Sequence, residues 1–131
     1  MRVSIFSDAD GATVADVLAD PDLGLLADWQ GQPLSLVRMA SILRSGDIEV
    51  QVVQIAAGGH FVMHSSPQVA FCQVVRGRGQ LGLPDGTSIP YSGPELYVFL
   101  PNSLHDWHDI SEDTLLSVCL VATKTPNPSP Q

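Results

Sequence analysis

The chain has 131 residues, of which 44 % are hydrophobic, and this length and composition predict one folded domain around one core. Fourteen acidic residues against six basic ones give a formal net charge of −8. This charge disfavours nucleic acid and anionic membrane surfaces as partners, because both would repel it. No apolar run is long enough to span a membrane, and the first residues lack the apolar segment of a signal peptide, so we expect a cytoplasmic protein.

Residues 1–33 are expected to form an N-terminal extension. The segment VSIF, residues 3–6, predicts a short strand. Residues 8–30 combine helix-favouring residues with acidic starts, but Pro21 and Gly24 interrupt the pattern. We therefore predict two short helical turns in this part of the chain.

The pattern changes to strands at Leu34. Two β-rich runs, LSLVRMASILR and IEVQVVQIA, flank the turn SGD and predict a hairpin. Further short strands are expected in HFVMH, AFCQVV, QLGL, SIPYS, ELYVF, HDWHDI and TLLSVCLVATK, with turns at RGRG and PDGT. Closely spaced short strands predict an all-β sandwich or small barrel over residues 34–124. The proline-rich segment 125–131 is predicted to be a disordered tail.

Two cysteines, Cys72 and Cys119, both lie in apolar segments that predict strands. In a reducing compartment such cysteines are expected to be free, buried thiols rather than a disulfide.

The four histidines of the chain form two close pairs, His60 with His64 and His105 with His108. Strand alternation predicts that His60 and His64 share one face, and the same parity continues to Gln68, Ala70 and Cys72. In the second pair, His105 shares a face with Trp107, and His108 points the other way unless a bulge intervenes.

Imidazole is a ligand for zinc, iron, nickel and copper, and a catalytic metal site needs about three protein ligands. His64 and His105 supply two. The third remains open among several nearby side chains: His60, His108, Gln68, Asp106 and Asp109. A polar pocket without metal is an equal alternative.

The spacing of these residues resembles the first motif of the cupin family, which is glycine, five residues, His-x-His, three or four residues, glutamate, six residues and glycine. Gly58 and His64 match the first glycine and the first histidine. Ser66 stands in place of the second histidine and Ala70 in place of the glutamate, while Gly77 matches the closing glycine. Two of the three ligand positions in this motif are therefore changed.

The segment from Gly93 to His105 resembles the second cupin motif. Pro101 matches the proline of that motif, Ser103 stands where its glycine is expected, and His105 comes one residue early. Gly93 is two residues farther from Pro101 than the motif requires.

The resemblance implies an antiparallel double-stranded β-helix, the jelly-roll barrel of cupins, with a metal near its mouth. The metal would be zinc, iron, nickel or manganese, or none, because Ser66 and Ala70 are poor ligands. Cys72 would share the inward face and could serve as a substitute ligand. Dimerisation with exchange of N-terminal strands is common in small cupins, so we expect a homodimer, with residues 3–6 as the exchanged segment.

Three functions are compatible with such a barrel. The first is a metal-dependent enzyme, of oxygenase or isomerase type, acting on a small oxygen-bearing molecule. The second is a small-molecule-binding or sensor protein without metal. The third is a metal-free enzyme in which a histidine acts as general base. In each case we expect the barrel pocket to be lined by Ser66, Gln68, Ala70, Cys72, Tyr97 and Trp107.

Overall fold

A computed structural model describes residues 1–123, so the predicted tail, residues 125–131, lies outside the described residues. The described part contains nine strands: β1 (Arg2–Ser7), β2 (Gly11–Asp16), β3 (Leu25–Trp29), β4 (Gln32–Ser45), β5 (Ile48–His64), β6 (Val69–Gly82), β7 (Ser88–Ser92), β8 (Glu95–Phe99) and β9 (His105–Val121). None of the described residues forms a helix, and none could therefore supply a helix that crosses a membrane.

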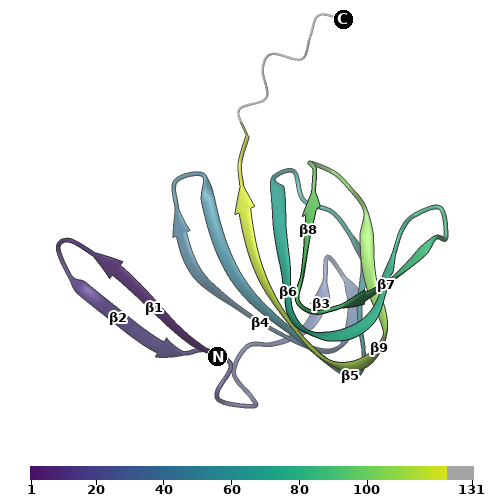
Figure 1. Cartoon of the computed structure of the whole chain (residues 1–131), viewed down its shortest axis with the longest axis horizontal. Coiled ribbons are helices and arrows are strands. Elements are labelled where there is room, and N and C mark those ends of the chain that lie inside the picture. The colour runs from purple at the N-terminus through teal and green to yellow at the C-terminus, as the bar shows by residue number, and fades with distance from the viewer. Residues whose placement is uncertain (124–131) are drawn as a thin grey trace, which may run out of the picture.

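Seven of the strands form one antiparallel sheet: six follow the order β3-β4-β5-β9-β6-β7, and the seventh, β8, pairs with β6. The long strand β6 pairs with β9 along one edge, and along the other it pairs first with β8 and then with β7. The sheet is strongly curved, and its concave face surrounds the core (Figure 1). This architecture confirms the predicted jelly-roll barrel.

Strand alternation explains which side chains fill the barrel. In β6, Ala70, Cys72 and Val74 are buried, whereas the intervening Phe71 and Gln73 are exposed. The buried core extends through all the long strands and includes Val37, Val53, Ile55, Phe61, Leu81, Tyr91, Trp107, Ile110 and Leu116. Both cysteines are free, as predicted, and Cys119 is only partly buried.

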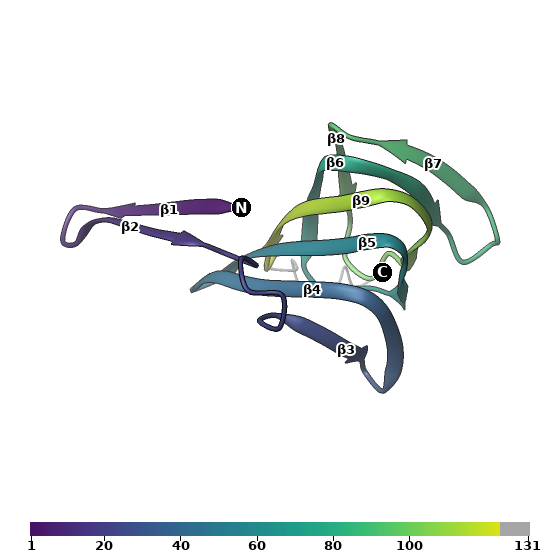
Figure 2. The same ribbon diagram turned by 90° about the horizontal axis from the view of Figure 1, so that it is seen from below.

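The predicted helical turns in residues 8–30 are wrong, because this segment forms strands β2 and β3. Strand β3 joins β4 through the two-residue turn Gln30–Gly31, in which both residues have positive φ. That turn type matches the twist of a hairpin, so pairing with β4 overrides the weak helical preference. Strands β1 and β2 pair only with each other, and Figure 2 shows their hairpin extending away from the large sheet.

The predicted turn at RGRG is also wrong, since β6 continues through these residues. The register of β6 against β9 shifts at Arg76 and Arg78, and Gly77 between them has a φ of 116°. A Cβ atom at position 77 would overlap Thr114, so glycine lets the strand bend here without breaking.

Candidate functional site

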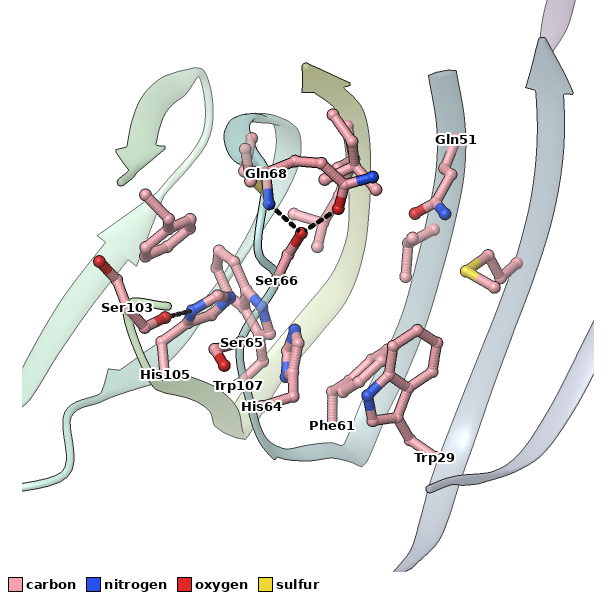
Figure 3. Close-up of a pocket in the computed structure, with 18 of the residues that line it drawn as sticks. Trp29, Gln51, Phe61, His64, Ser65, Ser66, Gln68, Ser103, His105 and Trp107 are labelled. Carbon is pink, nitrogen blue, oxygen red and sulfur yellow. Dashed lines mark hydrogen bonds between the residues drawn. The ribbon is translucent and has the colours of Figure 1, made fainter. Parts of the chain in front are cut away.

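A cavity on the concave side of the sheet lies between strands β3, β4, β5, β6, β8 and β9 (Figure 3). Its volume is about 90 Å³. One buried water needs only about 10–15 Å³, so a small organic molecule is a suitable occupant. The lining includes Trp29, Met39, Gln51, Phe61, His64, Ser65, Ser66, Gln68, Ala70, Cys72, Phe99, Ser103, His105, Trp107 and Leu116.

His64 and His105 lie side by side in this lining. They are register partners on β5 and β9, and their ring centroids are 4.4 Å apart. The Nδ1 atom of His64 lies 2.8 Å from the carbonyl oxygen of Val62, and that of His105 lies 3.1 Å from the carbonyl oxygen of Ser103. Because a carbonyl oxygen only accepts, each Nδ1 carries a proton and donates it, and in the neutral ring Nε2 is left as the acceptor.

Both imidazoles are neutral at physiological pH. Burial and, to a smaller extent, the neighbouring His64 ring together lower the pKa of His105 to about 4. Burial also lowers the pKa of His64 below its ordinary value of 6.5. The paired rings therefore offer two nitrogen lone pairs and no positive charge.

Aromatic side chains form the walls around the two histidines. The Phe99 ring stacks on His105 with a centroid distance of 3.7 Å, and the Phe61 ring lies 4.3 Å from His64. Trp29 and Trp107 contact the same cluster from β3 and β9 (Figure 3). The Nε1 atom of Trp29 is enclosed by protein and has no hydrogen-bond partner among the described residues, so this wall is apolar toward the cavity.

The remaining polar groups lie near Ser66. Its hydroxyl donates to the side-chain oxygen of Gln68 and accepts from the Gln68 backbone N–H (Figure 3). Ala70 and Cys72 line the cavity as well, and burial raises the pKa of the Cys72 thiol to about 12. The thiol thus stays protonated and acts as a small apolar surface.

The structure brings most of the predicted pocket residues together but separates the two members of each histidine pair. The face-sharing predicted for His60 and His64 is wrong, because the register shifts between Ile55 and Phe61 and again before His64. These irregularities place Phe61 in the cavity instead of His60. His60 and His108 lie outside the cavity, both near the Asp106 carboxylate.

Tyr97 is not in the cavity lining either, although it packs against the core beside Trp107. Sequence reasoning missed Trp29, Phe61 and Phe99 as wall residues. Phe61 and Phe99 belong to the segments HFVMH and ELYVF, which were predicted as strands, whereas Trp29 belongs to the segment wrongly predicted as helical. No spacing signal connects Trp29 to the histidines.

Solved structures with a similar fold include several that are named cupins. A cupin 2 conserved barrel domain protein from Rhodopseudomonas palustris superposes with a TM-score of 0.61, 15 % identity, and coverage of 76 % of this chain and 70 % of that one. An RmlC-like cupin from Desulfovibrio desulfuricans superposes with a TM-score of 0.60 and 17 % identity, and the match covers 66 % of this chain and 82 % of that one. The polyketide cyclase RemF from Streptomyces resistomycificus superposes with a TM-score of 0.60 and 13 % identity, and the match covers 71 % of this chain and 70 % of that one.

Comparison with protein-family models finds no match, and comparison with curated proteins finds none. The structural likeness defines the class: this chain has the fold of the cupin superfamily. At these identities the likeness concerns the fold alone, so the function has to be argued from the cavity.

The cavity residues do not fit the metal that this fold implies. Two neutral imidazoles are present, but the positions resembling the other two cupin ligands hold Ser66 and Ala70. Within residues 1–123 no group of three or more His, Cys, Asp or Glu side chains is placed to hold a metal ion. Since a catalytic site needs about three protein ligands, His64 and His105 are one ligand short, and the protonated Cys72 thiol does not replace it.

Proposed function

We propose that this protein binds a small, mainly apolar, oxygen-bearing molecule in its barrel without a metal. The observation that carries the proposal is the pair of neutral imidazoles, His64 and His105, whose Nδ1 atoms are held by backbone carbonyls. Their Nε2 atoms then accept hydrogen bonds from hydroxyl or N–H groups of the ligand.

The charge of the cavity lining favours a neutral ligand. The described lining residues include no Asp, Glu, Lys or Arg. A ligand carboxylate would face two nitrogen lone pairs and would lose its hydration without gaining a cation. A ligand ammonium group would lack a carboxylate partner for the same reason. The aromatic walls favour a planar molecule, because rings stack well against Phe61, Phe99 and the two tryptophans.

A metal-dependent enzyme of oxygenase or isomerase type is less well supported, because both would need the missing third ligand. The relation to the polyketide cyclase RemF is one of fold, at 13 % identity. We therefore propose binding of the ligand and not its turnover.

The chain provides its own reporter for this test, because both of its tryptophans line the cavity. We would titrate EDTA-treated protein with 2-naphthol, 2-methoxynaphthalene and 2-naphthoate while following tryptophan emission. We expect 2-naphthol to bind most tightly. The methoxy analogue should bind about fivefold more weakly, since one hydrogen bond is worth about 1 kcal/mol. The carboxylate should not bind measurably.

The double variant with His64→Phe and His105→Phe keeps aromatic rings beside Phe61 and Phe99 but removes both acceptor nitrogens. It should lose the preference for naphthol over its methyl ether, whereas His60→Gln, a control outside the cavity, should keep it. Equal affinities of the wild-type protein for all three probes would refute the proposal. Binding that appears only after zinc, iron, nickel or manganese is added would favour the metal-dependent alternative.

A further inference from the structure

A second group of polar side chains lies on the outer face of the barrel, across three neighbouring strands. Ser88 of β7 and Asp106 of β9 are both register partners of Gly82, which lies on β6 between them. Strand alternation places Asp106 opposite to the cavity residues His105 and Trp107. This row therefore faces away from the pocket described above.

The His108 ring lies across Gly82 and connects the two ends of the row. Its Nδ1 is 2.7 Å from Asp106 Oδ1, and its Nε2 is 3.2 Å from Ser88 Oγ. A Cβ atom at position 82 would overlap Asp106 Oδ1 and would come within 3.0 Å of His108 Cε1. Gly82 is not one of the glycines with a positive φ. Glycine is therefore required at this position for space rather than for backbone conformation.

The hydrogen bonds assign a role to each nitrogen. Because the Asp106 carboxylate only accepts, His108 Nδ1 donates to it, and Nε2 is left to accept the hydroxyl hydrogen of Ser88. The Asp106 side chain is only 20 % exposed. Its hydrogen bond from Nδ1 holds the His108 imidazole in this tautomer and orientation. In the structure the Ser88 hydroxyl donates to Gln80 Oε1 at 2.9 Å. Exchange of the oxygen and nitrogen of the Gln80 amide turns an N–H donor toward Ser88 Oγ and leaves the hydroxyl hydrogen for His108 Nε2.

We propose that Ser88, His108 and Asp106 form a nucleophile, base and orienting carboxylate, and that Ser88 accepts acyl groups from neutral activated esters. The same order of contacts defines serine hydrolase triads on unrelated folds, where roles and geometry identify the site. The proposal is independent of the barrel cavity and of its ligand.

The expected reaction has two steps. Ser88 Oγ bonds to the ester carbonyl carbon while its proton passes to His108 Nε2, and the alcohol leaves with that proton as the C–O bond breaks. Water then attacks the acyl-serine, again losing a proton through His108, and the acid is released with Ser88 restored. No oxidant or other co-reactant is needed.

The surroundings indicate which esters would react. A surface hollow beside His108 is lined by Gly58, Gly59, His60 and Ser111 and offers space for the acyl group. Asp109 Oδ2 lies 3.9 Å from His108 Nε2, and the chain carries a net charge of −8. Esters bearing a carboxylate or phosphate should therefore be repelled, and small neutral esters should be preferred.

The test uses the full chain with p-nitrophenyl acetate. We expect a burst of p-nitrophenol, a gain in intact mass of one acetyl group, and an acetylated peptide containing Ser88. Ser88→Ala should abolish the adduct, whereas Ser92→Ala, an exposed serine on the same strand and face, should leave it unchanged. His108→Gln should slow acylation by about 100-fold, as expected for loss of a general base.

The variant Asp106→Asn tests the orienting role, since it should slow acylation while leaving the far-UV circular dichroism spectrum unchanged. Acetylation located on histidine or on the amino terminus, or an adduct that persists in Ser88→Ala, would overturn the assignment. So would a wild-type protein that is not acylated at all while its folded spectrum is intact.

Discussion

The protonation of His105 links the stability of the barrel to pH. In the folded chain the ring is 6 % exposed and stacked on Phe99, and burial lowers its pKa to about 4. In the unfolded chain the ring is solvated and its pKa returns to the ordinary value of 6.5. As the pH falls below 6.5, the unfolded state therefore takes up a proton before the folded state does.

The size of the effect follows from these two values. The contribution of the neutral His105 ring to the free energy of unfolding is fully present above about pH 6.5 and is lost as the pH falls towards 4. Below that value this residue causes no further change. One pKa unit corresponds to about 1.4 kcal/mol. Between pH 7 and pH 5, protonation of His105 should thus lower the free energy of unfolding by about 2 kcal/mol. The lowered pKa of His64 acts in the same direction.

Urea unfolding at both pH values, for the wild type and His105→Gln, isolates this contribution from other titrating groups. The variant should lose about 2 kcal/mol less than the wild type over that interval. His60→Gln, with its side chain 44 % exposed outside the cavity, should retain the wild-type dependence. An identical pH dependence in His105→Gln and the wild type would show that the ring is not buried as a neutral group in the cavity.

Three further outcomes can be measured. The variant Tyr91→Phe should lower the free energy of unfolding by about 1–2 kcal/mol in urea titrations, because the hydroxyl of buried Thr114 would lose its 2.6 Å partner. The full chain should be a homodimer by light scattering, and removal of residues 1–17, whose hairpin pairs only with itself, should give a folded monomer. Replacing Ser66 by His and Ala70 by Glu together should produce stoichiometric zinc binding by elemental analysis, while the wild type should bind none.

The sequence predicted the barrel well because its hairpins depend on local signals. The SGD turn places Gly46, at a φ of 55°, between two apolar runs, and β4 and β5 pair there as expected. The inward positions of Ala70 and Cys72 also followed from simple alternation. These features require no knowledge of distant contacts, since turn type and side-chain period are set by the neighbouring residues.

The side chains that build the cavity were harder to predict where the strand register shifts. Alternation assigned His60 and His64 to one face, but two irregularities in the pairing of β5 with β9 bring Phe61 to the inside in place of His60. Trp29 was missed because the weak helical preference of its segment concealed a hairpin. Both failures arise from pairing with another strand, which a count along one strand does not include.

The two faces of β9 show how a single strand can serve two different polar sites. His105 points into the barrel, where burial removes its charge and a backbone carbonyl fixes its tautomer. His108, three residues later, points outward, where a carboxylate fixes its tautomer instead. In this barrel, Ser66 and Ala70 stand at the positions that resemble two cupin metal ligands. One imidazole thus lies in the cavity, where we propose that it accepts a hydrogen bond from a neutral ligand, and the other lies at the surface, where we propose that it transfers a proton.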